Sequence, residues 1–254
     1  MNIKIKNLFL IGGIVVSVIL SSCKKEDDNT SGSGTNPPSN ETGTFTDSRD
    51  SKTYKWVKIG EQVWMSENLN YTGSEIKHIT DNDEWENNSD YDGWSYFHNS
   101  DSLGKIYGAL YQWEAAKKAC PAGWHLPTDE EWMQLENYLI ENGYSYDGVI
   151  GNSYIAKSLS STTGWSMTSG NQGAVGNSDF PEYRNKTGFS ALPGGCRDYR
   201  NGRFFNLSRL GFWWSATEYD SDNIYTSSLD YSTTEIYHYN YLKSSGFPVR
   251  CVRD

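Results

Sequence analysis

Residues 107–139 read YGALYQWEAAKKACPAGWHLPTDEEWMQLENYL and contain two stretches with helical spacing of apolar side chains. The first, residues 107–119, ends just before Pro121, which cannot continue a helix. The second begins at a capping box, in which Thr128 precedes Glu131 by three residues. Its apolar stripe follows at helical spacing: Trp132, Leu135, Tyr138 and Leu139. We therefore expect two main helices in this part of the chain.

Short strand-like stretches lie on both sides of these helices. Residues 54–59 alternate in polarity and meet residues 63–65 across Gly60, which predicts a β-hairpin. The Gly-, Ser- and aromatic-rich part that follows adds residues 204–207, 212–216, 224–229 and 247–252. Residues 72–104 are polar and acidic, which is typical of a long loop. The pattern predicts an α+β fold with two main helices packed on short, twisted antiparallel strands.

The first 23 residues resemble the signal of a bacterial lipoprotein. Lys4 and Lys6 precede an apolar run, residues 8–20, that is too short to span a bilayer but typical of a secretory signal. The run ends in Leu-Ser-Ser-Cys, which resembles a lipobox. We expect removal of residues 1–22, acylation of Cys23 with a palmitate-type chain, and anchoring to a membrane. The alternative is an N-terminal anchor helix with a chance cysteine.

The residues after Cys23 indicate where the anchor faces. Residues 24–28, KKEDD, resemble the signal that sends lipoproteins of Bacteroidetes to the outer face of the outer membrane. The alternative is that these residues are only the charged, solvated start of a linker. In that case the anchor could also face the periplasm. Residues 29–43 are almost free of apolar side chains. We therefore expect a disordered linker over residues 23–43 and a single domain over residues 44–254.

Composition limits the partners of this domain. The net charge of the whole chain, −10, argues against nucleic acid as a partner. Ten Trp and 18 Tyr leave two interpretations open, an aromatic core or exposed rings that stack on sugars or peptides.

Motifs of catalysis and metal binding are missing from the sequence. The four His residues form neither HExxH nor a paired-His zinc pattern, and CxxC, GxSxG and P-loop patterns are absent. We therefore expect no enzyme, no cofactor and no metal, with His125 as a hydrogen-bonded structural residue. Residues 88–93 resemble the first half of a calcium loop, but its twelfth position is Asn99 rather than Glu. We expect a solvated acidic loop there, with calcium as the open alternative.

Aromatic and charged side chains gather in the Gly-rich part of the chain. Because adjacent residues on a strand face opposite ways, we expect one of Trp213 and Trp214 in the core and the other exposed. The candidate ligand-binding residues are Arg197, Asp198, Tyr199, Trp213, Trp214 and Glu218. The alternative is an aromatic core with structural ion pairs.

Three blocks of sequence resemble the Fibrobacter succinogenes major paralogous domain. They are the opening block 46–69, the middle block 107–132 and the closing block 188–253, which contains GFSALPGG, WWSATE and VRCVR. The resemblance covers residues 44–254 and implies an exported, lipid-anchored bacterial protein, with no activity to carry over. Where the family has an aromatic residue this chain has Cys196, so the role of that thiol is not inherited.

Residues 126–132 also resemble a segment of sulfatase-modifying factors, which share a C-type-lectin-like fold. This resemblance implies the same fold here. An exported chain with Cys120, Cys196 and Cys251 is expected to form one disulfide and leave one thiol unpaired. In C-type-lectin-like domains a disulfide commonly joins the helical layer to the last strand, which implies Cys120 with Cys251.

Two functions follow from these observations. The favoured one is a non-enzymatic binding or adhesion domain for a glycan or protein, displayed on the outer membrane. The rival is an enzyme related to the formylglycine-generating sulfatase-modifying factors, which use a cysteine pair with copper. Beside a disulfide, the remaining thiols of this chain are too few for such a pair.

Overall fold

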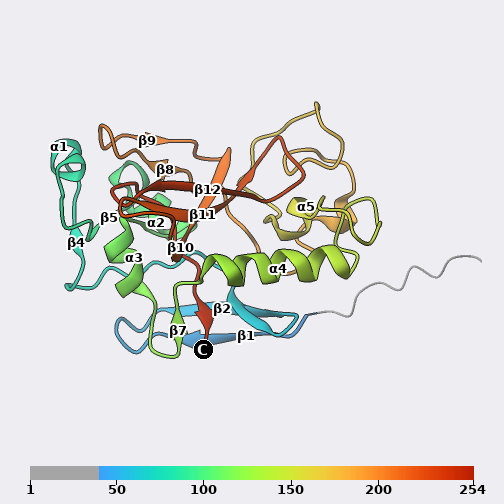
Figure 1. The fold of residues 1–254 in the computed structure, drawn as a ribbon, viewed down its shortest axis with the longest axis horizontal. Coiled ribbons are helices and arrows are strands. Elements are labelled where there is room, and N and C mark those ends of the chain that lie inside the picture. Colours follow the sequence, from blue (N-terminus) through green and yellow to red (C-terminus); the bar gives the residue numbers. More distant parts are fainter. Residues whose placement is uncertain (1–39) are drawn as a thin grey trace, which may run out of the picture. The chain divides into compact units, whose positions relative to one another are not determined.

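The computed structural model describes residues 40–254, in which short strands alternate with a few helices (Figure 1). The expected α+β class is therefore confirmed, whereas the C-type-lectin-like arrangement stays a prediction. The signal, Cys23 and the linker up to residue 39 lie outside the described residues. Among residues 40–254, no helix has the length and apolar content needed to cross a membrane.

A five-stranded antiparallel sheet joins the start of the domain to its end. Its order is β1 (Thr42–Thr46), β2 (Thr53–Ile59), β3 (Gln62–Met65), β13 (Val252–Arg253) and β7 (Trp124–His125). The expected hairpin is confirmed, because Ile59 pairs with Gln62 across a turn in which Gly60 has a φ of +59°. Val252 pairs with both Trp64 and His125, so the C-terminal strand fills the gap between β3 and β7.

The ordered domain begins earlier than the sequence predicted. Thr42 and Gly43 were expected in the linker, but they form the first residues of β1 and pair with Val57 and Trp56. Gly43 lies so close to Trp56 that a side chain there would meet the indole ring at 2.5 Å. Because this contact requires a glycine, and glycine is also common in linkers, the composition of residues 42–43 suggests a linker although they form a strand.

The C-terminal part of the chain forms a three-stranded antiparallel sheet. Its order is β10 (Leu210–Glu218), β11 (Asn223–Asp230) and β12 (Tyr237–Leu242). The longest helix, α4 (Asp129–Glu141), lies between this sheet and the five-stranded one (Figure 1). The expected capping box of Thr128 and Glu131 is confirmed, and Trp132 packs 4.6 Å from Trp64.

The remaining elements are short. Two further sheets are formed by β4 (Lys77–His78), β5 (Gly93–Ser95) and β6 (Leu110–Tyr111), and by β8 (Cys196–Arg197) and β9 (Phe204–Phe205). The other helices are α1 (Asn82–Glu86), α2 (Asp101–Tyr107), α3 (Trp113–Ala119) and α5 (Ala156–Leu159), with 3-10 turns at Phe97–Asn99 and Pro181–Tyr183.

Two predictions about residues 72–119 were wrong. Residues 72–104 are not a plain loop, because they contain β4, α1 and β5 and bury Trp85, Trp94 and Phe97. Residues 107–119 are not one helix either. Gly108 breaks it with a φ of +79°, a backbone conformation that favours glycine. Leu110 and Tyr111 then form β6, and α3 begins only at Trp113.

A disulfide joins Cys120 to Cys251, the pair that the resemblance to C-type-lectin-like domains implies, and Cys196 is a free thiol. The bond connects the end of α3 to the residue before β13. Beside it, Arg250 is fully buried and its guanidinium donates to Asn68 Oδ1 at 3.0 Å and to the Ser190 carbonyl at 2.6 Å. Burial lowers the pKa of Arg250 to about 9.

Candidate functional site

The two tryptophans predicted for the binding surface are both buried, so that prediction was wrong. Trp213 and Trp214 do face opposite sides of β10, as a strand requires, but each side carries its own core. Trp213 packs toward α4 and donates to Asn68 Oδ1 at 3.0 Å, while Trp214 donates to the Tyr111 carbonyl at 2.8 Å. With no exposed face and satisfied N–H groups, neither residue can contact a ligand.

Arg197 and Glu218 also have structural partners. The buried guanidinium of Arg197 donates to the carbonyls of Gly202 at 2.7 Å and Asp81 at 2.9 Å, and it lies 4.2 Å from the ring of Trp85. Burial lowers the pKa of Arg197 to about 10. Arg197 therefore fixes the α1 segment against β8 rather than offering its charge to a ligand. Glu218 ends β10, where its carboxylate lies 3.3 Å from Lys243 Nζ.

A hollow of about 440 Å³ lies between the β8–β9 hairpin and the residues around β12 and Phe247. Three of the predicted binding residues line it: Arg197, which is fully buried, Asp198 and Tyr199. We call this hollow the Ser245 pocket. Its lining includes Cys196, Asp198, Tyr199, Phe205, Tyr241 and Ser245.

The hydroxyl of Ser245 is the unusual group in this pocket. Ser245 is only 2% exposed, and its Oγ has no hydrogen-bond partner within the described part of the chain. A buried hydroxyl without a partner costs about 1–3 kcal/mol, and buried polar groups in native proteins rarely remain unpaired. One residue that lines the pocket therefore has a buried hydroxyl whose hydrogen-bonding capacity is unused within residues 40–254.

Aromatic rings form the walls around Ser245. Phe212 stacks on Phe247 with ring centroids 4.8 Å apart, and Tyr241 lies edge-on to Phe247 at 5.1 Å. Phe205 also lines the pocket, and its side chain is 43% exposed. Flat apolar faces beside a few polar groups are typical of small-ligand sites. The pocket combines ring surface with a hydroxyl, which suits a ligand that has both apolar faces and hydroxyls.

The charged groups of the pocket neutralise each other. Burial raises the pKa of Asp198, but hydrogen bonds from the Arg200 side chain and backbone outweigh it, so the pKa is lowered overall. The carboxylate of Asp198 lies 2.8 Å from the Arg200 guanidinium. An ion pair of this kind accepts and donates hydrogen bonds without selecting strongly for a charged ligand.

Cys196 is the free thiol at the edge of the pocket. Burial and the nearby charge of Asp198 raise the pKa of Cys196 to about 12. A thiolate, rather than a thiol, is the nucleophile in cysteine chemistry. At neutral pH this side chain is therefore a neutral thiol, whose Sγ lies 3.7 Å from the Phe205 carbonyl.

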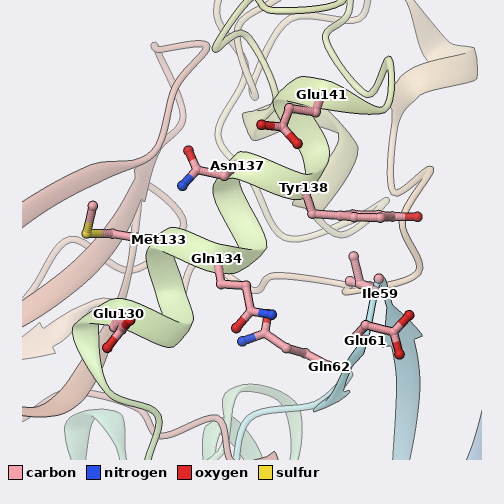
Figure 2. A pocket seen from close by; sticks show the side chains of 10 residues that line it. Ile59, Glu61, Gln62, Glu130, Met133, Gln134, Asn137, Tyr138 and Glu141 are labelled. Carbon is pink, nitrogen blue, oxygen red and sulfur yellow. The ribbon is translucent and has the colours of Figure 1, made fainter.

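Figure 2 shows another hollow, an open groove of about 660 Å³ between α4 and the turn of the β2–β3 hairpin. Tyr138 extends over Ile59, and the carboxylates of Glu61, Glu130 and Glu141 lie around the rim. None of the residues that line this groove has a buried polar side-chain atom without a hydrogen-bond partner. The groove thus lacks the unpartnered buried atom found at the Ser245 pocket, a feature that a hollow of about 310 Å³ lined by Asn70 shares through Asn70 Oδ1.

Comparison with family models identifies the family of this chain. The model of the Fibrobacter succinogenes major domain matches residues 57–253, which is most of the chain and includes the whole Ser245 pocket. The chain belongs to the Fibrobacter succinogenes major domain family. No curated protein and no solved structure matches it.

In this member of the Fibrobacter succinogenes major domain family, His125 and the segment that resembles a calcium loop both form hydrogen bonds within the fold. His125 is hydrogen-bonded at both ring nitrogens, to Asp254 at 2.6 Å and Glu131 at 2.8 Å. In the segment that resembles a calcium loop, the buried Asn88 amide donates to Gln112 Oε1 at 2.6 Å. Residues 40–254 hold no group of three or more His, Cys, Asp or Glu side chains arranged for a metal ion.

The sequence interpretation missed the residues that make the pocket distinctive. Ser245 is an ordinary serine in the sequence, and only its burial without a partner marks it. The sequence does contain a pattern that predicts strand β12, the alternation of Tyr237, Tyr239 and Tyr241, but the strands expected above do not include it. This alternation places Tyr241 on the same face of the sheet as Phe212, where both line the pocket of this Fibrobacter succinogenes major domain.

Proposed function

We propose that this protein is a lipid-anchored, surface-displayed lipoprotein whose domain binds a glycan without catalysing a reaction, and that the Ser245 pocket holds the glycan. The unpartnered hydroxyl of Ser245 is the observation that carries this proposal. Its burial beside an open hollow is explained if a ligand supplies the missing hydrogen bond.

The rings around Ser245 support a glycan over a peptide. A sugar ring has an apolar C–H face and hydroxyls at its edge, and aromatic side chains offer flat apolar surface beside polar groups. Phe205 and Tyr241 supply that surface, while Ser245 and the Asp198–Arg200 pair supply hydrogen bonds. A protein ligand remains the alternative outcome of the binding test.

The thiols support a binding role over the rival enzyme. A sulfatase-modifying type of reaction needs a cysteine pair, but Cys120 and Cys251 are bonded to each other. Cys196 is left without a second thiol among residues 40–254, and its pKa is raised to about 12 by burial. Both observations favour a site that binds its ligand unchanged.

Membrane anchoring rests on the sequence. The basic start, the apolar run and the Leu-Ser-Ser-Cys motif that ends at Cys23 support acylation. Residues 24–28 support display on the outer face of the outer membrane. The linker up to residue 39 would hold the domain clear of the lipid headgroups.

The test is a glycan array probed with the full chain purified in detergent, as wild type and as Ser245→Ala and Ser95→Ala. Ser95 is the matched control, because its buried Oγ also lacks a partner while it lies outside the Ser245 pocket. We expect glycan binding by wild type and Ser95→Ala, and weaker binding by Ser245→Ala. An array that stays blank for folded wild type, or equal binding by all three proteins, contradicts the proposal.

A further inference from the structure

The exposed ring of Phe205 borders two hollows at once. On one side is the Ser245 pocket, and on the other is a polar hollow of about 640 Å³. We call the second one the Arg203 hollow. Its lining includes Asp81 and Asp83 from the α1 segment, His98, and Arg203 from the approach to β9. Phe205 therefore forms a ridge that a ligand can cross from one hollow to the other.

The buried side chain of Arg197 contacts residues on both sides of this ridge. In the β8–β9 pairing, Cys196 lies opposite Phe205 and Arg197 lies opposite Phe204. Arg197 lines the Ser245 pocket, and its guanidinium donates to the Thr80 carbonyl at 3.3 Å and the Asp81 carbonyl at 2.9 Å. Thr80 and Asp81 line the Arg203 hollow. The positions of the two hollows are thus fixed by the same guanidinium.

The Arg203 hollow offers free polar groups. Within residues 40–254, the side chains of Asp83 and Arg203 make no intramolecular hydrogen bond or ion pair, whereas the Asp81 carboxylate caps α1 through the Glu84 N–H at 2.9 Å. Two carboxylates, of Asp81 and Asp83, and one guanidinium, of Arg203, are among the groups that line this hollow. The local balance, like the net charge of −10, disfavours an anionic ligand.

We infer that the ligand is a neutral oligosaccharide of two or more units, which crosses Phe205 with one unit in the Ser245 pocket and the next in the Arg203 hollow. This inference rests on the proposed function. A chain of this length uses the exposed ring on both sides and satisfies Ser245 at one end and the free Asp83 and Arg203 side chains at the other.

The probes are neutral β1,4-linked oligomers of glucose, xylose and N-acetylglucosamine, from monosaccharide to hexasaccharide, with oligogalacturonides as charged counterparts. Calorimetry on the full chain compares the wild type with Asp83→Ala/Arg203→Ala and with Phe205→Ala. Tyr219→Ala is the matched control, because Tyr219 is 54% exposed and lines neither hollow. Thermal melts of all four proteins establish that each is folded.

We expect the wild-type affinity for at least one neutral series to rise about tenfold or more from the monosaccharide to the longer oligomers. Asp83→Ala/Arg203→Ala should bind the monosaccharide like wild type and lose that rise, Phe205→Ala should lose it too, and Tyr219→Ala should keep it. Oligogalacturonides should bind more weakly than neutral oligomers of equal length.

Three results would overturn the inference while the proposed function stands. They are monosaccharide binding that does not improve with length, an undiminished rise in Asp83→Ala/Arg203→Ala, and tighter binding of oligogalacturonides. Binding of no member of any series, together with a blank glycan array, would overturn the proposed function and this inference together.

Discussion

Cys120 and Cys251 are bonded to each other across a sequence separation of 131 residues, with their Cα atoms 5.9 Å apart. Cys120 follows α3, and Cys251 precedes the strand that lies between β3 and β7. Cys251 is fully buried in the core that also contains Trp113 and Trp124. The bond therefore closes a loop that includes most of the domain.

Loss of this disulfide should destabilise the protein strongly. Cross-linking so long a loop restricts the unfolded chain by about 4–5 kcal/mol, as an upper figure. We expect Cys251→Ser to lower the melting temperature markedly, whereas Cys196→Ser, which removes a free thiol, should change stability by about 1 kcal/mol at most. Peptide mapping without reduction should yield a peptide that links Cys120 to Cys251. A linked peptide that contains Cys196 would contradict the assignment.

His238 should make stability depend on pH. Its Nε2 lies 2.8 Å from Glu136 and its Nδ1 lies 3.5 Å from Asp129. The hydrogen bond to Glu136 raises the pKa of His238, and burial only partly opposes it. Because the folded pKa lies above the unfolded value of about 6.5, the stabilisation is fully present below that value and is lost as the pH rises through the folded pKa.

We therefore expect His238→Gln to be less stable than the wild type at pH 5, with a difference that shrinks toward pH 9. Urea unfolding across this range measures the difference, and the two proteins share all other titrating groups. Glu136→Gln should weaken the same pH dependence. A gap between His238→Gln and wild type that stays constant with pH would refute this account.

We expect Arg197 to stabilise the fold rather than to bind a charged ligand. Arg197→Ala leaves the buried carbonyl of Gly202 and the partly buried carbonyl of Asp81 without their donor and opens a cavity beside Trp85. We expect a loss of about 3 kcal/mol or more and faster hydrogen exchange in the α1 segment. The exposed Arg200 is the control, since its ion pair is screened by solvent and Arg200→Ala should leave the stability nearly unchanged. Similar stability of the two variants would show that Arg197 has no anchoring role.

Cys23 should carry the membrane anchor. Labelled palmitate should enter the wild-type protein in bacteria and fail to enter Cys23→Ser. Equal labelling of the two proteins would rule out the lipoprotein assignment.

The parts of the fold that local physics determines could be predicted from the sequence. The α4 capping box needs only Thr128 and Glu131 at the right spacing, and the β2–β3 hairpin needs alternation and Gly60. The single helix over residues 107–119 failed because tertiary contacts decided the outcome. Leu110 and Tyr111 are fully covered and form a strand, although their spacing also fits a helix.

The candidate site was located only in part. Asp198 and Tyr199 were identified because polar and aromatic residues cluster in that stretch, and both line the Ser245 pocket. Trp213 and Trp214 were assigned wrongly, since alternation predicts that they face opposite ways but not that cores lie on both sides of β10. Ser245 has no sequence signal, because an unpaired hydroxyl exists only in the folded chain.

The most direct test of the glycan-binding account is a calorimetric titration of wild type, Ser245→Ala and Ser95→Ala with the tightest-binding glycan from the array. Loss of one hydrogen bond of about 1 kcal/mol predicts about fivefold weaker binding by Ser245→Ala. Its melting temperature should be unchanged or higher, because the substitution removes an unpaired buried hydroxyl. Ser95→Ala should bind like wild type. Equal affinity of Ser245→Ala and wild type would contradict the account.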